Sequence, residues 1–418
     1  MKFTKLSLVA ALAVSAAFAG GDIAPVEPVV ETPSNKCAEC GDITGAIKLY
    51  YGSYDRGANA DLFDKNGALG DAYAELNYSR KLMDNVTANV GMAYITTLGL
   101  EGDLVSGTWA NHGPAPTVDD VAWITTANVA IQLANTTLVL GRQQLATPFF
   151  YSETWGIAAN TFDAAVAVNT DLPDTTLVAA WVGRGNGTAG GAIVNLNNQN
   201  FDGGHNELFG SEAAFAFGAI NKSISDVTLQ AWYYNVTSAE DALWLQADAN
   251  FGSISVGAQY AATYAQSVLA TNDTDAYAFK VGYEADALSA YVAYSYRGND
   301  ASALNIANIA TGAGAGSQSS LYTETYWNYG FVGQQDAETI ALGASYDLGM
   351  AKVAAQYTTV STSVANTATT GDMNEFALTA STKVGPINTD LAYVYDEKGV
   401  AGNAANTVLV MLSLPFSL

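Results

Sequence analysis

The last residues of the chain alternate strictly between two sets of side chains. One set is apolar without interruption and comprises Val408, Val410, Leu412, Leu414 and Phe416. The other set comprises Leu409, Met411, Ser413 and Pro415, and the sequence ends at Leu418. A period of two is that of a β-strand, so one face of this strand is wholly apolar. A terminal strand of this kind is typical of the closing strand of an outer-membrane barrel.

The same period of two recurs from Ile43 to the end of the chain. It is clearest in residues 47–52, 72–79, 86–94, 277–284 and 288–297. Segments of roughly 10 residues, apolar on one side and small or polar on the other, are the signature of transmembrane β-strands. A soluble sandwich also contains alternating strands, but it would more often divide into repeated domains. The sequence shows no internal repeat and no linker after Cys40.

The connections between these segments are alternately short and long. Eight tight ones lie near residues 84–85, 134–135, 172–173, 222–225, 251–252, 285–286, 348–349 and 385–386. Nine longer ones cover residues 57–70, 98–119, 144–160, 185–206, 238–241, 262–274, 298–336, 359–372 and 397–406. The pattern predicts an all-β transmembrane antiparallel barrel of about 18 strands, with short periplasmic turns and long extracellular loops.

The beginning of the chain predicts export. Lys2 and Lys5 precede an apolar run, and Ala17-Phe18-Ala19 provides a small-x-small cleavage site. We therefore expect a signal peptide over residues 1–19, a periplasmic linker over 20–42 and the barrel over 43–418. Cys37 and Cys40 are the only cysteines, and export favours a small disulfide loop between them. Their spacing also matches a redox motif, but no helix or βαβ pattern surrounds them.

Composition supports the same class of protein. Only 13% of the residues are charged, against about 25% in soluble proteins, and tyrosine is abundant with 23 residues. The net charge of -24 argues against nucleic acid as a partner. Carboxylates that line the lumen would concentrate cations there. The alternative is that acidic loops only solvate the exterior of the barrel.

One region carries a resemblance to a known family. It contains Leu140-Gly141-Arg142-Gln143, then Thr147-Pro148, then Thr161-Phe162-Asp163-Ala164-Ala165. This region resembles the OprD-type porins, in particular the major outer-membrane porins of campylobacter-type bacteria. The resemblance implies an 18-stranded barrel, commonly trimeric, that passes small hydrophilic solutes. The chain departs from the family in having only 16 lysines and arginines, which disfavours an arginine-rich anion path.

Selectivity in so wide a barrel depends on what narrows its lumen. Loop 144–160 is the candidate, with its aromatic residues wedged against the wall. The expected constriction residues are Arg142, Tyr151, Glu153, Trp155 and Asp163. The expected basic residues of the pore wall are Lys48, Lys280, Arg297 and Lys352. The alternative is that Glu153 caps a helical turn and that Arg142 pairs structurally with Asp163.

The sequence predicts no enzyme, because its two histidines, His112 and His205, have no recognisable catalytic partner. No metal spacing or cofactor fingerprint is present. We therefore expect an outer-membrane porin of a Gram-negative bacterium that passes ions and small hydrophilic solutes and prefers cations. Its partners would be membrane lipid, lipopolysaccharide and two further copies of itself in a homotrimer. The alternative is an adhesin or receptor barrel with a blocked lumen.

Overall fold

The structure is a computed structural model, and it describes residues 41–55, 61–100, 104–105, 120–154, 156–186, 205–207, 213–237, 240–266, 272–300, 305–309, 317–367, 370–399 and 404–418. The signal peptide, most of the linker, Cys37, Cys40, His112 and Trp155 lie outside these residues. No helix in the described part of the chain is long and apolar enough to span a membrane.

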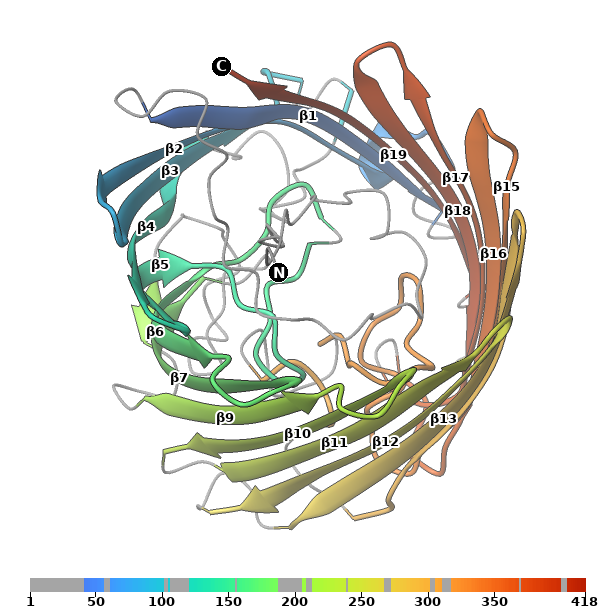
Figure 1. The fold of residues 1–418 in the computed structure, drawn as a ribbon. Helices are drawn as coiled ribbons and strands as arrows, with labels where there is room; N and C mark the ends of the chain where they lie inside the picture. Colours follow the sequence, from blue (N-terminus) through green and yellow to red (C-terminus); the bar gives the residue numbers. More distant parts are fainter. Residues whose placement is uncertain are drawn as a thin grey trace.

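The described residues form one antiparallel sheet that closes into a barrel (Figure 1). Its strands are β1 (Asp42–Asp55), β2 (Ala68–Met83), β3 (Val86–Thr96), β4 (Val121–Leu133), β5 (Thr136–Gln143), β6 (Phe162–Asn169), β7 (Thr175–Gly185), β8 (Asn206–Glu207), β9 (Ala214–Asn221), β10 (Val227–Val236), β11 (Glu240–Phe251), β12 (Ile254–Ala265), β13 (Thr274–Ala285), β14 (Leu288–Arg297), β15 (Glu338–Asp347), β16 (Ala351–Ser361), β17 (Met373–Val384), β18 (Ile387–Lys398) and β19 (Ala404–Ser417). Before β2 lies one 3-10 turn, η3 (Lys65–Gly67).

Closure comes from β1, which pairs with both β2 and β19. Lys48 lies opposite Tyr73 on one side and opposite Ser413 on the other. In the described part of the chain, the two-residue β8 pairs with the end of β7, and the other 18 strands build the wall, as predicted. All eight predicted tight turns lie between consecutive strands. Loop 238–241 is shorter than predicted, because β11 already begins at Glu240.

The alternation of side chains distinguishes the two faces of the wall. In β13, Tyr277, Phe279, Val281 and Tyr283 are 39–53% exposed, whereas Ala276, Ala278 and Gly282 are buried. The exposed apolar set is the outer face, which suits lipid. In β19 the buried side chains are Thr407, Leu409, Met411 and Ser413, so the apolar set identified in the sequence faces outward.

Candidate functional site

Loop 144–161, which joins β5 to β6, folds into the lumen (Figure 1). The ring of Phe149 makes edge-to-face contacts with Tyr234 and Trp244, with both centroid distances at 5.5 Å. These partners are buried side chains on the inner face of β10 and β11. Phe150 also contacts Tyr234, at 5.6 Å. The aromatic side chains of the loop thus wedge it against the wall, as the sequence predicted.

The same loop reaches a distant part of the wall. The ammonium group of Lys48 on β1 donates a hydrogen bond of 3.0 Å to the carbonyl oxygen of Ile157. That ammonium group also lies 5.1 Å from the ring centre of Tyr73 on β2. The loop is therefore held both by β10–β11 and by β1, so that it crosses the lumen.

Loop 298–337, which joins β14 to β15, meets the first loop inside the barrel. The amide nitrogen of Asn308 donates to the carbonyl oxygen of Tyr151 at 2.9 Å and to the carboxylate of Glu153 at 3.1 Å. The hydroxyl of Tyr151 donates to the carbonyl oxygen of Gln318 at 2.6 Å. Glu153 is only 5% exposed. The contacts place Tyr151 and Glu153 where the two loops interlock.

The second loop is fastened to the wall by a carboxylate. Glu375, on the inner face of β17, accepts hydrogen bonds from the backbone nitrogens of Tyr326, Trp327 and Asn328, at 2.6, 3.1 and 2.8 Å. The side-chain amide of Asn328 adds a fourth donor at 2.7 Å. Successive backbone N–H groups that converge on one anion form a strong, charge-assisted anchor.

A second buried carboxylate lies within the loop itself. Glu324 accepts hydrogen bonds from the backbone nitrogens of Ser319 and Thr325, at 2.5 and 2.9 Å, and from the hydroxyl of Thr325 at 3.0 Å. Burial raises the pKa of Glu324 from 4.5 to about 7, although these hydrogen bonds oppose the shift. The packed loop therefore binds a proton more tightly than the unpacked loop does.

We expect the packing of this loop to depend on pH. Because the pKa of Glu324 is raised to about 7 in the packed loop, the packed state is most stable below pH 4.5 and loses stability as the pH rises to 7. The full difference is about 3 kcal/mol, at 1.36 kcal/mol per unit of pKa. Hydrogen exchange of residues 317–337, corrected for the intrinsic rate, should be faster at pH 8 than at pH 5. Glu324→Gln should remove this dependence; an unchanged profile would contradict the assignment to Glu324.

The four predicted basic wall residues all lie on the inner face. Lys280 and Lys352 line a cavity of about 140 Å³, and Lys280 lies over the rings of Tyr291 and Tyr322 at 5.0 and 5.7 Å. Arg297 is fully buried and donates to the carbonyl oxygens of residues 298 and 300, at 2.8 and 2.7 Å. Lys48 and Arg297 therefore support loops, whereas Lys280 and Lys352 line internal space.

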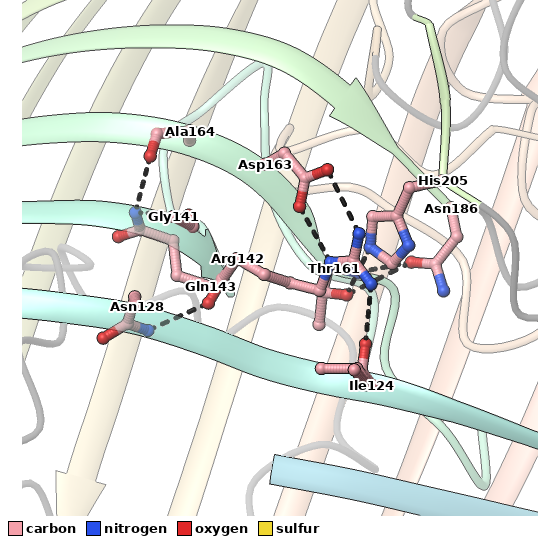
Figure 2. A network of polar contacts seen from close by, with 10 residues as sticks. All are labelled: Ile124, Asn128, Gly141, Arg142, Gln143, Thr161, Asp163, Ala164, Asn186 and His205. Carbon is pink, nitrogen blue, oxygen red and sulfur yellow. Dashed lines mark hydrogen bonds and ion pairs between the residues drawn. The ribbon is translucent and has the colours of Figure 1, made fainter. Parts of the chain in front are cut away.

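The structure corrects the expectation that Arg142 and Asp163 face the pore. Arg142 lies on the same face of β5 as Leu140, which is 44% exposed, and Asp163 lies opposite it on β6. Their side chains form a bidentate ion pair of 2.8 and 3.1 Å on the outer face (Figure 2). A third nitrogen of the guanidinium donates to the carbonyl oxygen of Ile124 at 3.1 Å. The structural pairing that the sequence offered as an alternative is confirmed.

Several lumen-facing carboxylates were missed from the sequence. Glu75 shares the inner face of β2 with Tyr73, whose hydroxyl donates to it at 2.9 Å, and Asp390 lies on the inner face of β18. Glu375 belongs to the same class. In each case the charged residue alternates with an exposed apolar set, such as Phe376 and Leu378 around Glu375, so strand parity alone could have placed it.

The fold is similar to solved porin structures at low sequence identity. Pseudomonas aeruginosa OpdK, in its crystal structure with vanillate, gives a TM-score of 0.71 at 14% identity, covering 91% of this chain and 99% of that one. OccK8 (OprE) of the same organism gives 0.67 at 16% identity, covering 91% and 99%. OccD3 (OpdP), also from it, gives 0.68 at 12% identity, covering 94% and 95%. No protein-family model and no curated protein matches the chain.

Proposed function

We propose that the chain is a porin of a Gram-negative outer membrane, which passes ions and small hydrophilic solutes by passive diffusion. The observation that carries the proposal is a closed wall of 18 strands with an apolar outer face, into whose lumen two interlocked loops fold. So wide a barrel leaves an aqueous space that side chains alone do not fill. The resemblance of residues 138–165 to OprD-type porins, and to their campylobacter-type branch, supports the same function.

The loops act as the constriction of this channel, and the lumen favours cations. Glu75 and Asp390 place carboxylates on the inner wall, whereas Lys48 donates to the backbone of the constriction loop. Negative groups around a narrow passage raise the local concentration of cations. We further propose that a signal peptide directs export of the chain. The mature protein forms a homotrimer and contacts lipopolysaccharide.

Planar-bilayer recording of the mature protein tests the function. We expect stepwise openings and a reversal potential across a KCl gradient that favours potassium. Glu75→Gln should reduce this preference, because it removes one lumen charge while keeping the hydrogen-bonding shape of the side chain. Glu338→Gln, on the exposed outer face of β15, is the matched control and should leave the preference unchanged. Openings that favour chloride would overturn the cation preference and point to Lys280 and Lys352.

The interlocked loops also favour one alternative, an adhesin or receptor barrel whose lumen is blocked. Their contacts through Asn308 and Tyr151 join segments more than 150 residues apart inside the barrel. A folded, heat-modifiable barrel that never opens in the bilayer would replace the channel by this alternative.

A further inference from the structure

One buried carboxylate on the inner wall is left without a partner. Glu240 is the first residue of β11 and shares the inner face of that strand with Ala242 and Trp244. Its side chain is 0% exposed, and neither carboxylate oxygen has a hydrogen-bond partner among the described residues. Burying a carboxylate without compensation is strongly unfavourable. Glu240 therefore needs a compensating group from outside the described part of the chain.

Two threonine hydroxyls lie beside this carboxylate. Thr263 on β12 and Thr274 on β13 are directly opposite each other, and Thr263 lies opposite Ala242, one inner-face position from Glu240. The threonines are 1% and 3% exposed, and neither hydroxyl has a hydrogen-bond partner within the described ranges. Opposite residues have Cβ atoms about 5 Å apart, and diagonal neighbours about 7 Å. Three adjacent strands (Figure 1) thus bring four unsatisfied oxygens to one part of the inner face.

The neighbouring strands supply no positive charge to this part of the wall. β10, β11 and β12 contain no lysine or arginine, and Lys280 lies six positions along β13 from its first residue. Arg297 on β14 donates to the carbonyl oxygens of residues 298 and 300. The side chain opposite Glu240 on β10 is the apolar Val236. The carboxylate therefore lies in surroundings that are apolar and without a counter-charge.

The next residue along β11 provides a direct comparison. Asp241 points to the opposite face of the strand and accepts a hydrogen bond of 2.9 Å from the hydroxyl of Tyr233 and one of 2.8 Å from the amide of Asn235. The wall thus provides two donors for the carboxylate on its outer face. It provides none, from the described residues, for the buried carboxylate of Glu240.

We infer that Glu240, Thr263 and Thr274 bind a small monovalent cation such as sodium. Carboxylate and hydroxyl oxygens are the ligands that hard cations prefer. A single positive charge neutralises the single carboxylate, so that the buried site carries no net charge. All four oxygens can face one ion at the same time. The ion thereby ties together the ends of β11, β12 and β13 that carry the long loops.

A proton or a divalent cation fits the site less well. A protonated carboxyl group supplies one donor, which satisfies one acceptor and leaves the other oxygens unpaired. Calcium takes 6–8 oxygen ligands, and magnesium keeps several of its waters. Either divalent ion would leave a net positive charge beside Val236 and Ala242. Because Glu240 is fully buried, the bound ion is a structural part of the wall and not an ion in transit.

Hydrogen exchange of the mature protein in sodium chloride and in choline chloride, at equal ionic strength and neutral pH, tests the site. Choline carries the same charge but is too large to enter between the three side chains. A ligand that binds only the closed wall slows opening about tenfold at about ten times its dissociation constant. We expect residues 240–242, 263–265 and 274–276 to exchange about tenfold more slowly in sodium chloride. Equal exchange in both salts, or slowing by calcium chloride alone, would overturn the inference.

Three variants assign the effect to these side chains. Glu240→Gln removes the charge at nearly constant volume and should abolish the slowing by sodium. Thr263→Val removes one ligand oxygen and should reduce it. Asp241→Asn is the matched control on the outer face and should retain it in full. Slowing that persists in Glu240→Gln would mean that sodium acts elsewhere on the wall, and the inference would be wrong.

Thallium(I) keeps the test decisive if the variants do not fold, because it replaces monovalent cations and scatters X-rays anomalously. Wild-type crystals in a thallium(I) salt should show an anomalous peak between the oxygens of Glu240, Thr263 and Thr274. A map without a peak there would refute the site. The inference does not depend on the proposed channel. Glu240→Gln should conduct like wild type, so loss of the ion site and failure of the channel proposal are distinguishable.

Discussion

Replacing Glu375 with alanine is expected to release loop 317–337 from the wall and to raise single-channel conductance about threefold or more. Four donors on residues 326–328 lose their shared acceptor. A hydrogen bond to a charged group contributes about 1.5–3 kcal/mol, so losing even two weakens the anchor by about 3 kcal/mol. A change of that size shifts the population of the packed loop by about a hundredfold. The wall itself should stay folded, because its backbone hydrogen bonds do not involve this side chain.

Two further variants serve as controls for Glu375→Ala. Glu338→Ala removes a carboxylate from the exposed outer face of β15, which is separated from β17 by one strand. This variant should leave conductance at the wild-type value. Glu375→Gln retains one acceptor oxygen and should give an intermediate conductance. Hydrogen exchange of residues 317–337 is measured in parallel. If exchange accelerates in Glu375→Ala while conductance stays constant, the loop is anchored as described but does not narrow the channel.

The fold was predictable because a transmembrane strand repeats one simple rule many times. Alternation in residues 277–284 and in residues 408–416 fixed which side chains face outward, and the structure confirms both. All eight tight turns were recognisable because each lies between two segments of alternating apolar residues. Strand boundaries were less exact where the first strand residue is charged, as at Glu240, since a charge resembles a loop residue.

The candidate site was only partly predictable. Arg142 was placed in the pore because it enters the expected constriction loop, yet its side chain lies on the same face of β5 as Leu138 and Leu140. Counting parity from Leu140 would have put it on the outer face.

The interlocking of the two loops could not be read from the sequence. Asn308 and Glu153 are 155 residues apart, and neither belongs to a periodic segment. Their contact depends on how far each loop turns into the lumen. Likewise, Glu375 is recognisable as an inward residue, but its role as an anchor depends on three consecutive backbone nitrogens supplied by a different loop.

Phe149→Ala is expected to loosen both loops at once. Phe149 is 1% exposed and packs against Tyr234 and Trp244, while its carbonyl oxygen accepts a hydrogen bond of 2.9 Å from the backbone nitrogen of Ile309 in the other loop. Truncating a buried phenylalanine destabilises its surroundings by about 3–5 kcal/mol. The packing of the Phe149 ring against the wall fixes the position of its backbone. Truncating the ring should therefore also weaken the hydrogen bond from Ile309 to the carbonyl oxygen of residue 149.

Hydrogen exchange should therefore accelerate in residues 144–154 and 305–309 together, and single-channel currents should become noisier. Phe217→Ala is the matched control, because Phe217 is 51% exposed on the outer face of β9, two strands or fewer from the same aromatic partners. It should leave both loops unchanged. Faster exchange in residues 144–154 alone would mean that the second loop is held by Glu375 independently of the first. The two anchors would then act separately, and only the Glu375→Ala variant would alter the second loop.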